Sequence, residues 1–181
     1  ENNYMWPEAV EVAKTHKAHI MVAVLGEEEK LLERGKLFTK AMAVCCKQKY
    51  ATGVYTSGVV FEPRFYEGLA DMLKEDELPI FNWVWFGLYR SEGGLNGYTY
   101  GMDVFGKEEM EVLNTDAEPE ELRDFLASLA SYVLACDVTL QDGETIGFSA
   151  DDKHTITRSP GISLPEEQMT LKIGYEPIKG D

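Results

Sequence analysis

The feature that most constrains the fold is the run Ala18–Leu25, which is apolar on both of its alternating faces apart from His19. Successive side chains of a strand point to opposite sides, so this run has no polar face to turn toward water. It has the length of a strand and is far shorter than a membrane span. We therefore predict that Ala18–Leu25 is a central strand covered on both sides.

A strand of this kind needs a neighbour along each edge. Because it lies so close to Glu1, we expect the chain to lack residues upstream of Glu1. We also expect a sheet edge to be exposed or paired with another copy of the chain.

Other periodic segments predict a β-α-β-α order followed by antiparallel strands. Helices are predicted from Trp6 to His16, from Glu27 to Cys45 and from Pro63 to Leu73, with a strand over 51–61 that is bulged at Gly58. Later segments predict an aromatic hairpin over 81–106, a helix over 119–133, a hairpin turn at Asp142–Gly143 and a last strand over 169–175.

This order predicts one α+β domain over residues 1–181. We expect a mixed β-sheet with helices packed against it as a two-layer sandwich. The alternative is a doubly wound α/β sheet. The consecutive aromatic strands and the late hairpins fit this alternative less well.

The charge of the chain is strongly negative. Its 32 acidic and 17 basic residues give a formal net charge of -15. Such a surface repels a phosphate backbone, so direct binding to nucleic acid is not expected. It could attract a basic protein partner, although a high net charge also simply keeps a protein dispersed.

The three cysteines indicate a reducing compartment, here the cytoplasm. Cys45 and Cys46 are neighbours in a predicted helix, where a disulfide between them is awkward. Cys136 and Cys45 lie on or beside apolar helix faces, where thiols are usually inert. No signal peptide or membrane span is visible.

Two histidines, His16 and His19, precede or begin the apolar run. Three residues apart on one helix they could share a metal, but the strand pattern starting at Ala18 places them in different elements. The other interpretation is that His16 packs at the helix end and His19 at the edge of the strand.

No metal or cofactor is expected from the remaining motifs. Three carboxylates follow Gly26, where a dinucleotide loop needs glycines, and the stretch around Ser57 lacks the frame of a nucleophile elbow. Two acidic clusters match no calcium loop and are explained by helix starts and turns: Glu108, Glu109, Glu111 and Asp116, and Asp151, Asp152 and His154.

Four stretches together resemble a known bacterial family. They are "HKAHIMVAVLG", "GVVFEP", "YGMDVFGKEEMEV" and "DGETIGFS", and the family is catalogued only as domain of unknown function 4261. The resemblance implies a bacterial intracellular protein with further residues ahead of the first motif. It supplies no activity, substrate or catalytic residue.

Function is therefore predicted from the residues. The main hypothesis is a non-enzymatic binding or interaction module with a basic protein partner, for example in an immunity or antitoxin-like role. Whether the protein is an enzyme stays open, because a metal-dependent hydrolase using His16 and His19 is the alternative. The candidate binding residues are His16, His19, Trp83, Trp85 and Glu109, and the aromatic ones, with Tyr98 and Tyr100, could equally be sheet core.

Overall fold

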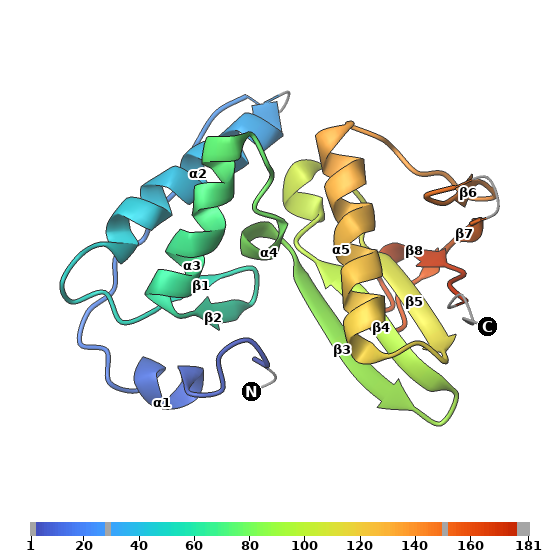
Figure 1. The fold of residues 1–181 in the computed structure, drawn as a ribbon, viewed down its shortest axis with the longest axis horizontal. Coiled ribbons are helices and arrows are strands. Elements are labelled where there is room, and N and C mark those ends of the chain that lie inside the picture. The colour runs from blue at the N-terminus through green and yellow to red at the C-terminus, as the bar shows by residue number, and fades with distance from the viewer. Residues whose placement is uncertain (1–2, 28–29, 150–151, 177–181) are drawn as a thin grey trace. The chain divides into compact units, whose positions relative to one another are not determined.

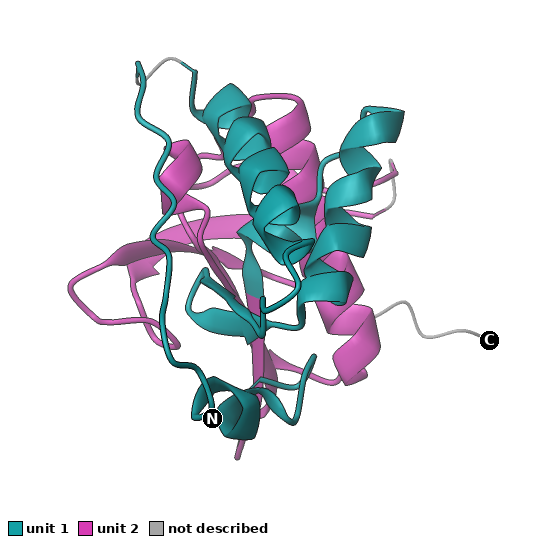
Figure 2. Cartoon of the chain, turned by 90° about the vertical axis from the view of Figure 1, so that its left-hand side faces the viewer, with its two compact units in different colours: residues 1–85 teal, residues 86–181 magenta. Residues whose placement is uncertain are grey.

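The computed structural model describes residues 3–27, 30–149 and 152–176. It has helices, a six-stranded mixed sheet and a two-stranded sheet, so the predicted α+β class is confirmed (Figure 1). The chain divides into two compact units, residues 1–85 and 86–181 (Figure 2). The single domain over residues 1–181 stays a prediction.

Unit 1 consists of helices around a short hairpin. The hairpin turns at Ser57 and Gly58, which both have positive φ, as a tight primed turn requires. Helix α3 begins after Glu62, whose carboxylate accepts a hydrogen bond from the Phe65 N–H at 2.7 Å. The elements are α1 (Ala9–Ala13), α2 (Leu31–Cys46), β1 (Val54–Thr56), β2 (Val59–Phe61), α3 (Pro63–Ala70), the 3₁₀ helix η2 (Asp71–Glu75) and α4 (Ile80–Trp83).

The core of unit 1 joins aromatic packing to a buried polar pair. The indole N–H of Trp83 donates a hydrogen bond of 2.6 Å to the hydroxyl of Thr39 on α2. Phe61 packs edge-on against Tyr66, with ring centroids 5.6 Å apart. Burial raises the pKa of the Tyr66 hydroxyl to about 12. These contacts connect α2, β2, α3 and α4.

Unit 2 is a sheet in the order β3-β4-β5-β8-β7-β6, and β5 and β8 run parallel within it. Neighbours β4–β5, β7–β8 and β6–β7 are antiparallel. The elements are β3 (Trp85–Ser91, whose first residue closes unit 1), β4 (Gly94–Tyr100), the 3₁₀ helix η3 (Asp103–Phe105), β5 (Met110–Thr115), α5 (Pro119–Ala135), β6 (Thr145–Ile146), β7 (His154–Pro160) and β8 (Met169–Ile173).

Helix α5 covers one face of this sheet (Figure 1). Its buried stripe contacts β4 where Gly97 leaves room: a Cβ there would lie 2.9 Å from both the Leu122 and the Leu126 side chains. Gly97 is the register partner of Val112 on β5, so Val112 lies on the same face. Packing of α5 on one face of the sheet makes the described part of unit 2 a two-layer structure, and its antiparallel pairings contradict the doubly wound alternative.

The predicted central strand Ala18–Leu25 is the main expectation that the structure contradicts. The segment forms neither helix nor strand, and its side chains are largely exposed. A strand exists only where a neighbour supplies backbone hydrogen bonds. The strands of unit 1, β1 and β2, pair with each other and not with Ala18–Leu25. The apolar pattern indicates a tendency to form a strand, but no neighbouring strand in the described chain pairs with this segment.

Smaller differences have similar causes. Within the predicted strand 51–61, residues 54–61 form the β1–β2 hairpin instead of one bulged strand, because Ser57 and Gly58 both have positive φ. The aromatic stretch begins with helix α4, and β3 starts only at Trp85. The turn at Asp142–Gly143 is present, but β6 after it pairs with β7 and not with residues 138–141.

Candidate functional site

The exposed apolar segment Ala18–Leu25 is the most unusual surface of unit 1. Ile20, Met21 and Leu25 are 82%, 86% and 90% exposed. Within the described parts of the chain, no backbone group of residues 17–26 pairs with another backbone group. The guanidinium of Arg34 reaches the Val24 carbonyl at 3.5 Å. Unpaired strand-like backbone with apolar side chains is a template for pairing with another chain.

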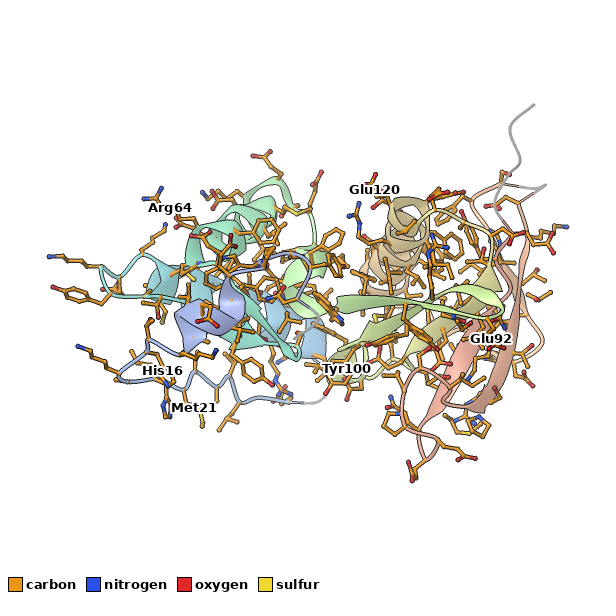
Figure 3. All side chains as sticks on the ribbon, turned by 90° about the horizontal axis from the view of Figure 1, so that it is seen from below. His16, Met21, Arg64, Glu92, Tyr100 and Glu120 are labelled. Atoms are coloured by element: carbon orange, nitrogen blue, oxygen red, sulfur yellow. The ribbon has the colours of Figure 1, made fainter. Side chains whose placement is uncertain are left out.

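His16 and His19 border this segment on its N-terminal side. The His16 ring lies 2.5 Å from the carbonyl of Ala13, the last residue of α1, as expected for a residue at the helix end. Both residues are exposed, so His19 is not packed at a strand edge as predicted. Figure 3 shows His16 and Met21 pointing outward. Among described residues, no group of three or more His, Cys, Asp or Glu could hold a metal ion.

Glu109 is a buried carboxylate that closes a loop. Its Oε1 accepts hydrogen bonds from the N–H groups of Gly101 at 2.7 Å and Met102 at 2.9 Å, with Asp103 N at 3.4 Å. Its Oε2 accepts one from the Thr99 hydroxyl at 2.7 Å. Burial is the largest cause that raises the pKa of Glu109, and these hydrogen bonds oppose it. The carboxylate faces the loop and not solvent.

Glu111, which lies on β5 two residues after Glu109, holds a second loop in the same way. This fully buried carboxylate accepts hydrogen bonds from the N–H groups of Ile162, Ser163 and Leu164 at 3.1 to 3.2 Å. It also pairs with the Lys172 ammonium at 3.2 Å, its register partner on β8. Consecutive N–H groups around one carboxylate form an anion-binding nest, and here the anion is part of the chain.

These two contacts explain the stretch "YGMDVFGKEEMEV" physically. Gly101 and Gly106 both have positive φ, which glycine adopts without strain, and they bracket the loop that Glu109 closes. Glu108 instead pairs with Arg158 at the surface. The three glutamates therefore do not converge on a cation, and they serve the fold in separate ways. The spacing of two between Glu109, just before β5, and Glu111 on β5 was the available signal that both side chains lie on one side.

His154 belongs to a second polar and aromatic cluster, in unit 2. One ring nitrogen lies 3.0 Å from the Gly174 carbonyl and the other 2.7 Å from the Asp152 carboxylate. The ring packs edge-on against Phe125. With both nitrogens facing acceptors, this imidazole has no lone pair directed at a substrate. Asp151, the third member of the predicted acidic cluster, lies outside the described residues.

The aromatic candidates are mostly core residues. Trp83, the last residue of helix α4, and Trp85, the first residue of β3, are both buried. The Tyr98 ring lies over Gly87, where a Cβ would come within 2.5 Å of the ring and its hydroxyl. Tyr100 keeps about half of its surface exposed, at 47%. The two tryptophans therefore offer little surface to a partner.

The cysteines are free thiols, and many of the basic side chains form ion pairs. The three cysteines are free, and burial raises the pKa of the Cys46 thiol to about 11, which makes it a poor nucleophile. No helix among the described residues is long and apolar enough to cross a membrane. Ion pairs with carboxylates engage Lys14, Lys30, Lys36, Lys47, Lys74, Lys107, Arg123, Arg158 and Lys172.

Comparison with known proteins supports the resemblance found in the sequence. Residues 98–174 match the family model described as Domain of unknown function (DUF4261). The match includes the stretch from Tyr98 that carries Glu109 and Glu111 and extends through β8, whereas "HKAHIMVAVLG" and "GVVFEP" lie before it. No curated protein and no solved structure matches the chain.

Proposed function

We propose that this chain is a non-enzymatic protein-binding module of the bacterial cytoplasm whose partner carries a basic surface. An immunity or antitoxin-like role against a basic protein is one concrete form. The observation that carries the proposal is that three polar residues of the family-matched segment 98–174 hold the fold together. Glu109, Glu111 and His154 are buried and hydrogen-bonded to the chain itself, so they support the fold instead of facing a substrate.

The charge of the surface supports the choice of partner. Acidic residues outnumber basic ones by 32 to 17, and ion pairs already engage many of the lysines and arginines. Surplus carboxylates remain at exposed positions, including Glu75, Asp76 and Glu77 in unit 1. Unit 2 has a comparable exposed set in Asp116, Glu118 and Glu120. A field of this sign speeds association with a basic protein and weakens with salt.

Of the candidate binding residues, His16 and His19 are the exposed ones, and they stay candidate contacts of the partner. Trp83, Trp85 and Glu109 are buried, so they would affect binding only by stabilising the fold. The hydrolase alternative needs a nucleophile or metal group beside the histidines, and no observation favours one.

Affinity capture at low salt from an extract of the source bacterium, followed by titration of any captured basic protein, tests the proposal. We expect the affinity to fall as salt is raised from about 50 to about 300 mM, because screening shortens the electrostatic range. Capture of no basic protein at low salt, or an affinity independent of salt, contradicts it.

Two matched triple variants separate a local contact from net charge. One carries Glu75→Gln, Asp76→Asn and Glu77→Gln, and the other Asp116→Asn, Glu118→Gln and Glu120→Gln. Each removes three negative charges from exposed positions in a different unit. A docking surface on one unit predicts unequal losses of affinity, whereas bulk attraction predicts equal ones. Unchanged affinity in both variants refutes the charge argument.

A further inference from the structure

We infer that Ala18–Leu25 is a dimerisation strand that pairs antiparallel with the same segment of a second copy. The inference goes beyond a basic partner, because the occupant is the chain itself. It starts from the backbone of residues 17–26, which pairs with no other backbone group within the described chain. It also starts from Ile20, Met21 and Leu25, which expose most of their apolar surface.

The composition of the segment suits a strand. Five of its eight residues are β-branched or long apolar residues, and it contains no Pro, Gly, Asp or Glu that would oppose pairing. The residues that natural edges use against unwanted pairing, charges and prolines, are absent from residues 18–25. An unprotected strand of this kind pairs readily with another strand.

Symmetry and charge favour a second copy as the occupant. A two-fold axis at Val22 makes the segment its own antiparallel partner, as an isologous interface requires. In this register Lys17 lies opposite Glu27, since each is five residues from Val22. The uncharged residues between them face one another, Ile20 opposite Val24 and Met21 opposite Ala23. The symmetry produces the Lys17–Glu27 pair twice.

The two charged residues are available for this exchange. Lys17 is exposed and forms no ion pair with a described carboxylate. Glu27 contacts Lys30 at 2.9 Å, but both side chains are about two-thirds exposed, at 69% and 66%. An exposed pair of this type contributes little and can be replaced. Opposite charges across a strand pair stabilise its register, and like charges destabilise it.

The net charge of -15 on each copy makes the dimer sensitive to salt in a defined direction. The copies repel one another at low ionic strength, and the Debye length falls to about 8 Å at physiological salt. Dimerisation should therefore strengthen as salt is raised. Binding to a basic partner should weaken over the same range, so the two proposals fail independently.

Sedimentation velocity of the whole chain over a range of concentrations, at about 50 and about 500 mM salt, measures the dimer. We expect a reversible dimer that is stronger at high salt. Met21→Asp should abolish it, whereas Val104→Asp, at an exposed apolar position in unit 2, should leave it unchanged. Hydrogen exchange should show protection of amides in residues 18–25 that increases with protein concentration.

Charge reversal tests the register. Lys17→Glu and Glu27→Lys should each weaken the dimer about tenfold or more, because two opposite-charge pairs become like-charge pairs. The double swap should restore the wild-type affinity. Arg90→Glu and Glu92→Lys, exposed in unit 2, are controls with the same changes in net charge. A monomer under all conditions, a dimer that survives Met21→Asp, or a double swap that fails to restore pairing overturns the proposal.

Discussion

Replacing Glu111 by alanine should destabilise the protein more than replacing the nearby surface glutamate, Glu108. The carboxylate is fully buried and is the acceptor for three consecutive N–H groups, those of Ile162, Ser163 and Leu164. It is also the carboxylate partner of Lys172, whose side chain is only 14% exposed. Glu111→Ala therefore leaves three donors and a largely buried ammonium without this acceptor.

The magnitude follows from these contacts. Breaking a buried ion pair by removing one partner costs about 3 to 5 kcal/mol, and each unsatisfied buried donor adds up to about 1 to 3 kcal/mol where water cannot reach it. Lys172 keeps the Ser159 and Pro160 carbonyls and the Thr170 hydroxyl as acceptors, which limits the loss. We expect a decrease of about 4 kcal/mol in the free energy of unfolding.

Urea denaturation followed by circular dichroism, with calorimetry for the melting temperature, measures the effect. A loss of about 4 kcal/mol corresponds to roughly 8 to 16 °C for a cooperative unit of 150 to 250 residues. Glu111→Gln should be nearly as damaging, because its amide group would place a donor against donors. The control is Glu108→Ala, which removes a partly exposed pair with Arg158 and should change stability by about 1 kcal/mol or less. Equal effects of Glu108→Ala and Glu111→Ala would refute the reasoning.

Three further predictions follow from single contacts. Burial raises the pKa of Glu109 above 4.5. The contribution of this carboxyl to stability is therefore full below the unfolded pKa and is lost as pH rises through the folded pKa. The free energy of unfolding of Glu109→Gln, relative to that of the wild type, should increase as pH rises over that window, and a pH series of urea melts checks the sign. His19→Ala should change stability by less than about 0.5 kcal/mol because the side chain is exposed, and added zinc should leave the wild-type melting temperature unchanged; a metal-dependent rise that is lost in both His16→Ala and His19→Ala would instead support the metal-site hypothesis. Gly97→Ala should destabilise by about 1 to 3 kcal/mol, since its Cβ would lie 2.9 Å from Leu122 and Leu126 beneath α5, and a neutral result in a thermal melt would show that α5 shifts freely.

Periodicity along the chain was enough to identify elements whose pattern is local. The helix predicted over 119–133 is α5, Pro119–Ala135, with Leu122, Leu126 and Leu129 on its buried stripe. An amphipathic helix satisfies its own backbone hydrogen bonds, so its existence depends on its own residues and on one apolar surface to cover. The α+β class follows from the same kind of reasoning, because it needs only the order of helices and strands.

Pairing between strands could not be determined in this way. Ala18–Leu25 has the pattern of a buried strand and is unpaired, because a strand depends on hydrogen bonds from a neighbour that its own residues do not specify. His19 was expected at the edge of that strand and is exposed for the same reason.

The glutamates of "GKEEMEV" show most clearly what the tertiary structure decides. As a sequence they form a charged run, and the spacing of two between Glu109 and Glu111 does not show that these two become buried while Glu108 stays at the surface. Alternation along β5 directs side chains to opposite faces, but burial depends on which loops close over them. For Glu111 that loop is residues 162–164, about fifty positions away, brought there by the parallel pairing of β5 with β8. A carboxylate becomes a structural acceptor only when distant backbone N–H groups converge on it, and only the folded chain brings them together.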